Sequence, residues 1–359
     1  MKPRLPQVPG VVWTALLALL AAWLLLWAPP AQAAGTSAAA ASDDTASLAE
    51  QARALQRAQR AVLGVQVLAV AEARSASTLG RARSGSGVLI RHDGLVLTIG
   101  YLVLEADQVQ LLREDGRPVP ARVLGYDVAT GFGLLQALAP LGLEPAPLGR
   151  ADRLPPQSPL MVASGGEAAA VSVAQLVARR PFSGYWEYHI DGALFTTPPR
   201  PDHSGAGLFN GAGELVGIGS LLVADATGGG AAGARRSGNM FVPVDLLAPI
   251  LAELRQVGFG AASQRAWLGL NCAEQDGQIH VLRVSDDSPA DVAGLEAGDR
   301  ILRIDGQQVQ TLAALWQALW AGGAPEREVS LLIERADQQQ TLKVFSVDRM
   351  KTLKRSQGI

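Results

Sequence analysis

Cysteine is almost absent from this sequence, since Cys272 is the only one among 359 residues. A single thiol excludes an intramolecular disulfide, so the fold must be stable through packing alone. Cys272 ends an apolar, strand-like stretch, residues 268–272. This setting favours a small core residue over a catalytic nucleophile.

Excess charge and aromatic residues are also scarce. Lys and Arg number 31, Asp and Glu 33, and aromatic residues make up 5% of the chain. Nucleic-acid binding needs a clustered basic face, which this sequence lacks. It also has no metal-ligand cluster and no phosphate-binding loop, so we predict no metal and no cofactor. Hydrophobic residues are plentiful at 48%, enough for two domains with their own cores.

The first 33 residues are typical of an export signal. Lys2 and Arg4 precede an apolar run at residues 11–28 that only Thr14 interrupts. Two prolines then break the run, and residues 31–33 (Ala-Gln-Ala) offer a cleavage site. The alternative is an uncleaved membrane anchor, because about 18 apolar residues just suffice to span a bilayer. Both predict that the rest of the chain is exported.

Residues 34–61 predict a flexible tether and a short helix. Residues 35–44 are low in complexity, and apolar positions at helical spacing follow at residues 46–62. From residue 62 the pattern changes to many short strands separated by glycine and proline, which is typical of an all-β sandwich or barrel. A helix is predicted at residues 244–257, which closes a first domain at residues 62–257.

A linker rich in small residues, 258–264, leads to a second domain at residues 265–347. Its pattern predicts five strands, a short helix at residues 289–293 and a longer one at residues 311–320. One of these strands is predicted at residues 267–270. The polar, basic tail, 348–359, is expected to fray.

The second domain resembles a PDZ domain of the type found in bacterial proteases. The resemblance rests on residues 288–290 (Ser-Pro-Ala), 293–295 (Ala-Gly-Leu), 297–302 (Ala-Gly-Asp-Arg-Ile-Leu) and 304–306 (Ile-Asp-Gly). It covers nearly the whole domain and implies a peptide-binding groove.

The PDZ carboxylate-binding loop is matched by Trp267, Leu268, Gly269 and Leu270. In such a loop, backbone N–H groups hold the terminal carboxylate of a peptide that adds as a strand. The groove is expected between this segment and the helix at residues 311–320, with preference for a hydrophobic terminal residue. Gly269→Val is expected to crowd the backbone that the carboxylate approaches. The alternative is a turn and core strand without binding.

The first domain resembles the protease domain of the HtrA/DegP family, trypsin-like serine proteases with a C-terminal PDZ domain. Matching segments are residues 85–90 (Gly-Ser-Gly-Val-Leu-Ile), 121–127 (Ala-Arg-Val-Leu-Gly-Tyr-Asp), 213–218 (Gly-Glu-Leu-Val-Gly-Ile) and 241–244 (Phe-Val-Pro-Val). The order and spacing of the domains agree. The implied fold class is mainly β: a trypsin-like double β-barrel followed by an α+β PDZ domain.

The family's catalytic triad is not intact in this sequence. A trypsin-type enzyme needs a serine, a histidine as general base and an aspartate that orients the histidine. Tyr101 stands at the histidine position, and Gly131 stands at the aspartate position. A phenol with a pKa of ~10 is protonated at neutral pH and is a poor proton acceptor.

The nucleophile segment keeps its serine but changes around it. Residues 200–208 read Arg-Pro-Asp-His-Ser-Gly-Ala-Gly-Leu, with Ser204 at the nucleophile position. Asp202 replaces the glycine of the family's oxyanion turn, and His203 lies between Asp202 and Ser204. A carboxylate at this position would repel a developing oxyanion.

A histidine from elsewhere could restore a catalytic pair. His203 is adjacent to Ser204 and is expected to point away from it. His92 falls in a hairpin turn and His280 in the PDZ domain, and His189 has no aspartate partner visible in the sequence. We therefore predict that Ser204 packs or hydrogen-bonds without attacking a substrate.

The sequence predicts a periplasmic protein, or one on the outer face of the inner membrane, that binds unfolded proteins or C-terminal peptides without cleaving them. The alternative is an active HtrA-type endopeptidase with an unusual arrangement around Ser204. A third possibility is a structural partner of a true family member. The resemblance implies a homotrimer.

Overall fold

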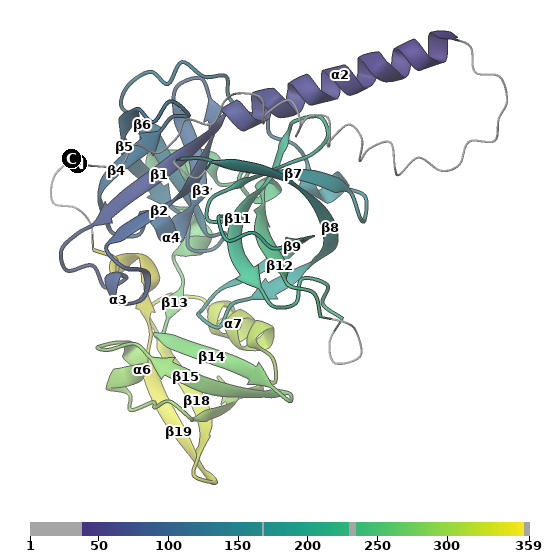
Figure 1. The fold of residues 1–359 in the computed structure, drawn as a ribbon. Coiled ribbons are helices and arrows are strands. Elements are labelled where there is room, and N and C mark those ends of the chain that lie inside the picture. The colour runs from purple at the N-terminus through teal and green to yellow at the C-terminus, as the bar shows by residue number, and fades with distance from the viewer. Residues whose placement is uncertain (1–37, 167–168, 230–234, 355–359) are drawn as a thin grey trace, which may run out of the picture.

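The computed structural model describes residues 38–166, 169–229 and 235–354 (Figure 1). The predicted signal peptide or anchor at residues 1–33 and the end of the tail lie outside these ranges. Within the described ranges, no helix combines the length and apolarity that a bilayer crossing requires.

The first closed barrel is formed by six antiparallel strands in the order β1-β2-β3-β6-β5-β4. Apolar side chains fill its interior; all five residues of β3, for example, are buried. The strands are β1 Val62–Ala69, β2 Ala82–Arg91, β3 Leu95–Ile99, β4 Ala106–Leu112, β5 Pro118–Tyr126 and β6 Phe132–Ala137. The helical turns α3 Ala76–Leu79 and α4 Gly100–Val103 connect strands of this barrel.

The second closed barrel has the strand order β10-β11-β12-β9-β8-β7. Its strands are β7 Pro159–Ser164, β8 Ala170–Ser183, β9 His189–Thr197, β10 Gly207–Phe209, β11 Leu215–Val223 and β12 Gly238–Pro243. A 3-10 turn, η1 Ala151–Arg153, precedes β7.

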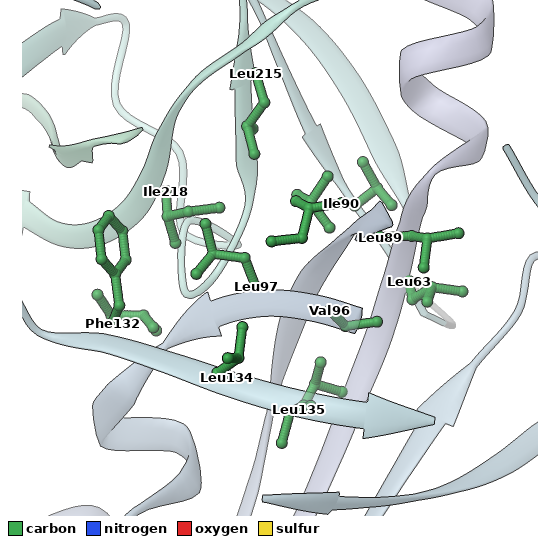
Figure 2. Close-up of a cluster of buried hydrophobic side chains, with 14 of the residues drawn as sticks. Leu63, Leu89, Ile90, Val96, Leu97, Phe132, Leu134, Leu135, Leu215 and Ile218 are labelled. Atoms are coloured by element: carbon green, nitrogen blue, oxygen red, sulfur yellow. The ribbon is translucent and has the colours of Figure 1, made fainter. Parts of the chain in front are cut away.

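One hydrophobic core runs through both barrels. Figure 2 shows Leu97 and Phe132 of the first barrel close to Leu215 and Ile218 of the second, and all four are fully buried. The two barrels are therefore packed together through this shared cluster, while a second cluster, which includes Leu208 and Phe241, lies within the second barrel. The double barrel confirms the predicted fold class.

The helix before the first barrel, α2 Ala38–Arg60, is longer than predicted. It begins inside residues 35–44, where we expected a flexible tether; alanine, which makes up much of this stretch, is the best helix former. Near its end Ala54 and Ala58 are buried. The backbone of Ala54 lies so close to Gly213 that a Cβ there would come within 2.5 Å of the Ala54 carbonyl oxygen. The helix is therefore fixed against the β10–β11 turn.

The helix predicted at residues 244–257 is interrupted. A 3-10 turn, η3 Val244–Leu246, is followed by turns and then by the shorter helix α5 Leu251–Gln256. Pro249 explains the break, because proline lacks an N–H group and disfavours helical backbone at the residue before it.

The PDZ domain contains a sheet in the order β14-β15-β16-β18-β19, with β17 paired to β16. The strand predicted at residues 267–270 is interrupted, because Trp267 ends one strand, Leu270 begins the next, and Leu268 and Gly269 lie in neither. The strands are β13 Ala266–Trp267, β14 Leu270–Gln275, β15 Gln278–Val284, β16 Arg300–Ile304, β17 Gln307–Gln308, β18 Glu328–Arg335 and β19 Gln338–Phe345. The helices are α6 Pro289–Val292 and α7 Leu312–Ala321, and the 3-10 turn η4 Ala261–Ser263 lies in the linker before the domain.

The described part of the tail is ordered, contrary to expectation. The short strand β20 Val347–Asp348 pairs with β13, and the turn η5 Arg349–Lys351 follows. The backbone N–H of Lys354 then donates to Glu105 of the first barrel at 3.1 Å. The tail thus leads the chain back from the second domain to the first barrel.

Candidate active site and peptide groove

Ser204 lies in the turn between β9 and β10, where the second barrel faces the first. Its carbonyl oxygen accepts a hydrogen bond from the N–H of Ser86 at 2.8 Å. The next residue, Gly205, has a φ of +74°, and a Cβ there would approach the Ser86 carbonyl oxygen to 1.9 Å. Only glycine fits at position 205, so the backbone turn that carries Ser204 depends on this residue.

Tyr101 reaches Ser204 from the other barrel. It lies in α4, directly after β3, and its hydroxyl oxygen is 2.7 Å from Ser204 Oγ and 2.9 Å from the Ser220 carbonyl oxygen. A phenol has one proton, and a carbonyl oxygen can only accept. With the phenol donating to Ser220, the hydroxyl of Ser204 donates to the phenol oxygen.

The phenol of Tyr101 is a weaker acid in this site than in water, so its basic form, the phenolate, is rarer. Burial raises its pKa to about 12, although the hydrogen bond with Ser204 opposes the shift. At pH 7 the phenolate is then about one molecule in 10⁵. The proton of Ser204 has a hydrogen-bond acceptor here but almost no base to remove it.

Gly131 cannot orient a residue at position 101. It has a φ of +84°, and its carbonyl oxygen accepts from the N–H of Gly100 at 2.7 Å. A Cβ at this position would lie 3.1 Å from the hydroxyl of Tyr188. The nearby carboxylate of Asp127 binds other partners, among them the N–H of Thr130 at 2.8 Å. The structure thus places Gly131 next to the Tyr101 turn without any catalytic side chain.

Asp202 behaves differently from our expectation, because its carboxylate is paired. It accepts hydrogen bonds from the guanidinium of Arg200 and from the hydroxyl of Ser164. Burial acts to raise the pKa of Asp202, but these bonds outweigh it and the pKa is lowered. The predicted repulsion of an oxyanion is therefore largely compensated by Arg200.

In the described part of the chain, no histidine is hydrogen-bonded to Ser204. The ring of His203 contacts the Arg200 carbonyl oxygen at 3.0 Å. His189 has an acidic neighbour that sequence reasoning missed, since its Nε2 lies 3.5 Å from Asp191, two residues further along the same strand. Its Nδ1 is 2.8 Å from the Ser183 hydroxyl, within the β8–β9 hairpin.

The N–H groups of Leu268, Gly269 and Leu270 converge on one carboxylate. This carboxylate belongs to Glu187 of the peptidase body, with donor–acceptor distances of 3.1, 2.7 and 3.0 Å. Trp267 flanks the loop at the end of β13 and does not share in these bonds. Sequence reasoning missed Glu187, although an acid between Trp186 and Tyr188 was a visible signal.

Gly269 is required for a reason other than the one predicted. Its φ is +90°, and a Cβ would come within 2.2 Å of the Ser288 side chain, away from the carboxylate. Gly269→Val would therefore damage the loop itself, so it is unsuitable for testing ligand binding.

Comparisons with known proteins agree with this architecture. A model of the trypsin-like peptidase domain matches residues 85–218, and a PDZ model matches residues 266–345. The chain combines a trypsin-like peptidase domain with a PDZ domain. This confirms the resemblance to HtrA/DegP proteases.

Relatives and solved structures point the same way. The chain is 28% identical over 277 residues to a probable periplasmic serine endoprotease, DegP-like, of Marinomonas sp., covering 74% of this chain and 57% of the relative. It is 27% identical over 271 residues to the serine endoprotease DegS of Haemophilus influenzae, covering 70% and 73%. The chain thus spans little more than half the length of the DegP-like relative. The periplasmic names support the predicted export.

The fold is also shared with HtrA-type proteases of known structure. The protease AlgW with a decapeptide matches at a TM-score of 0.51 and 20% identity, covering 83% of this chain and 98% of the other. AlgW with a tripeptide matches at 0.50 and 23%, covering 83% and 97%.

Proposed function

We propose that this chain is an HtrA-type protease homologue that has lost peptide hydrolysis and binds unfolded proteins or C-terminal peptides in the periplasm. The observation that carries the proposal is the bond between Tyr101 and Ser204. Attack by Ser204 requires a base near neutral pKa to take its proton. The phenol beside it has a pKa of about 12, and its own proton is directed to Ser220.

Peptide binding is supported by the geometry of the PDZ loop at Leu268, Gly269 and Leu270. The PDZ loop retains N–H donors that together hold a carboxylate, as capture of a peptide terminus requires.

We include homo-oligomerisation, a trimer by analogy with the family, in the proposal. Sedimentation of the purified chain would measure its mass.

The second candidate is an active endopeptidase that uses Tyr101 as its base. It is favoured by the direct contact at 2.7 Å and by the preserved glycine turn after Ser204. Such an enzyme would gain about tenfold in rate for each pH unit as the phenolate forms, with no plateau below pH ~11.

Two measurements on the same preparation separate the candidates. A fluorophosphonate probe should leave Ser204 unlabelled, and unfolded casein should remain intact at pH 7 and at pH 9.5. The matched control is Ser204→Ala. Casein cleavage that this substitution abolishes would establish the endopeptidase and refute the binding-only function.

A further inference from the structure

The PDZ groove is filled by the hairpin between β8 and β9. The Cys272 N–H in β14 donates to the Tyr185 carbonyl oxygen at 2.6 Å, and Trp186 forms an antiparallel bridge with Asn271. One step further along, the N–H of Leu270 donates to the Glu187 carboxylate at 3.0 Å. Residues 185–187 therefore run antiparallel to β14 as one more strand.

The helix on the other side of the groove holds the same hairpin. The indole N–H of Trp316 in α7 donates to the Gly184 carbonyl oxygen at 3.1 Å, and Gln317 lies 3.2 Å from His189. Figure 1 shows α7 on the side of the PDZ domain that faces the barrels. The segment thus lies between strand and helix, where an added peptide strand would lie.

The register of residues 185–187 along β14 explains why an acidic residue at position 187 meets the carboxylate-binding loop. Tyr185, Trp186 and Glu187 occupy three successive positions of an added strand, and the third is the one that meets the carboxylate loop. A free peptide would end at this position with its main-chain carboxylate. In a continuous chain the main chain goes on to Tyr188, so only an acidic side chain can supply the carboxylate. The buried Glu187 accepts from all three loop N–H groups.

We propose that residues 184–187 are an internal ligand of the PDZ domain, which a C-terminal peptide must displace before it can enter the groove. The inference rests on the proposed function in one respect, namely that outside peptides bind there at all. An internal ligand competes at a high effective concentration, in the millimolar range for short connections. The apparent affinity of an outside peptide falls in proportion to the fraction of open grooves.

The first arm of the test is a binding measurement on the full chain. The probe copies residues 181–186 (Pro-Phe-Ser-Gly-Tyr-Trp) and ends in a valine with a free carboxylate; its amidated form is the control peptide. Glu187→Ala should bind the free acid at least about tenfold more tightly than the wild type does. Glu114→Gln, which removes an exposed carboxylate from a turn of the first barrel, should leave the affinity at the wild-type value. Equal affinity of the wild type and Glu187→Ala would overturn the proposal.

The second arm needs no ligand, which separates this proposal from the proposed function. The amides of Leu268, Gly269, Leu270 and Cys272 should exchange slowly in the wild type and at least about tenfold faster in Glu187→Ala, with Glu187→Gln between them. Fast exchange in the wild type would overturn the internal ligand. Lost protection in Glu187→Ala without peptide binding in either protein would support the internal ligand and refute peptide capture.

Discussion

Tyr101 stands where the HtrA/DegP pattern has a histidine, and its surroundings suit a neutral phenol. The Ser220 carbonyl accepts its proton at 2.9 Å, and burial raises its pKa to about 12. The hydrogen bond to Ser220 and the burial of the ring both favour the neutral phenol over the phenolate. The position therefore stabilises the fold in the protonated state.

Replacing this phenol by imidazole should partly restore a nucleophile. Tyr101→His is expected to raise the rate of fluorophosphonate labelling of Ser204 about 100-fold or more, since a positioned base contributes about 10²–10⁴. The rate should increase with pH to a plateau above ~7, as imidazole with a pKa of ~6.5 loses its proton. Tyr101→Phe is the control and should stay unlabelled. If Ser204 of Tyr101→His remained unlabelled, the missing base would not be the only reason why Ser204 is unreactive.

Adding the missing aspartate should not help. Gly131→Asp places a side chain at a φ of +84° and against the Tyr188 hydroxyl. The double variant Tyr101→His, Gly131→Asp should therefore unfold at a lower temperature than Tyr101→His and label no faster, measured by thermal melting and the same probe.

Tyr101 should also contribute to stability at alkaline pH. Its folded pKa, about 12, exceeds the unfolded value of ~10, so its stabilisation is complete below pH ~10 and is lost as pH rises toward 12. The full effect is at most about 2 to 3 kcal/mol. Urea unfolding between pH 8 and 11.5 should show a shallower alkaline decline for Tyr101→Phe. Parallel declines would contradict the assignment.

Among the elements, the linker after α5 is held more firmly than its small residues suggested. The buried carboxylate of Asp127, at the end of β5, accepts from the Gly260 N–H at 3.0 Å and from the Ser263 hydroxyl. The linker is thus fixed to the first barrel, close to Gly131.

Removing this acceptor should release the linker. Asp127→Ala leaves several buried donors without a partner, which costs about 3 kcal/mol or more. Limited trypsin digestion should then cut near Arg265 at least about tenfold faster than in the wild type. Asp115→Ala, in an exposed turn, is the matched control. Equal cutting of both variants would show that the linker does not depend on Asp127.

Elements that are determined by neighbouring residues in the sequence could be predicted, whereas features that depend on contacts between distant residues could not. The strands of both barrels follow from short apolar runs between glycines, and α7 follows from helical spacing. The break in the 244–257 helix also had a local cause, Pro249, which should have been weighed. The pairing of Asp202 with Arg200 and of Glu187 with the PDZ loop depends on tertiary contacts, to which sequence periodicity is blind. The inactivity predicted for Ser204 and the peptide binding predicted for residues 267–270 stay predictions.

At the scale of the molecule, the two domains are connected at several places besides the linker. Arg265 lies over the Trp320 ring at 3.7 Å and donates to the carbonyl oxygens of Val128 and Glu187. The tail adds the contact between Lys354 and Glu105. Such contacts couple the stability of one domain to that of the other.

We therefore expect the wild type to unfold in one calorimetric transition. Glu187→Ala should separate this into two transitions, because the PDZ domain then loses its hold on the β8–β9 hairpin. The control is again Glu114→Gln, with one transition. Two transitions in the wild type would show that the domains unfold independently.

The strand that residues 185–187 add to β14 has one more consequence. β14 ends the PDZ sheet, and a bare sheet edge is a template on which other chains can pair and aggregate. Because the β8–β9 hairpin covers this edge, the edge is not available for intermolecular strand pairing and aggregation. Variants that free the groove should accordingly be less soluble at high concentration than the wild type.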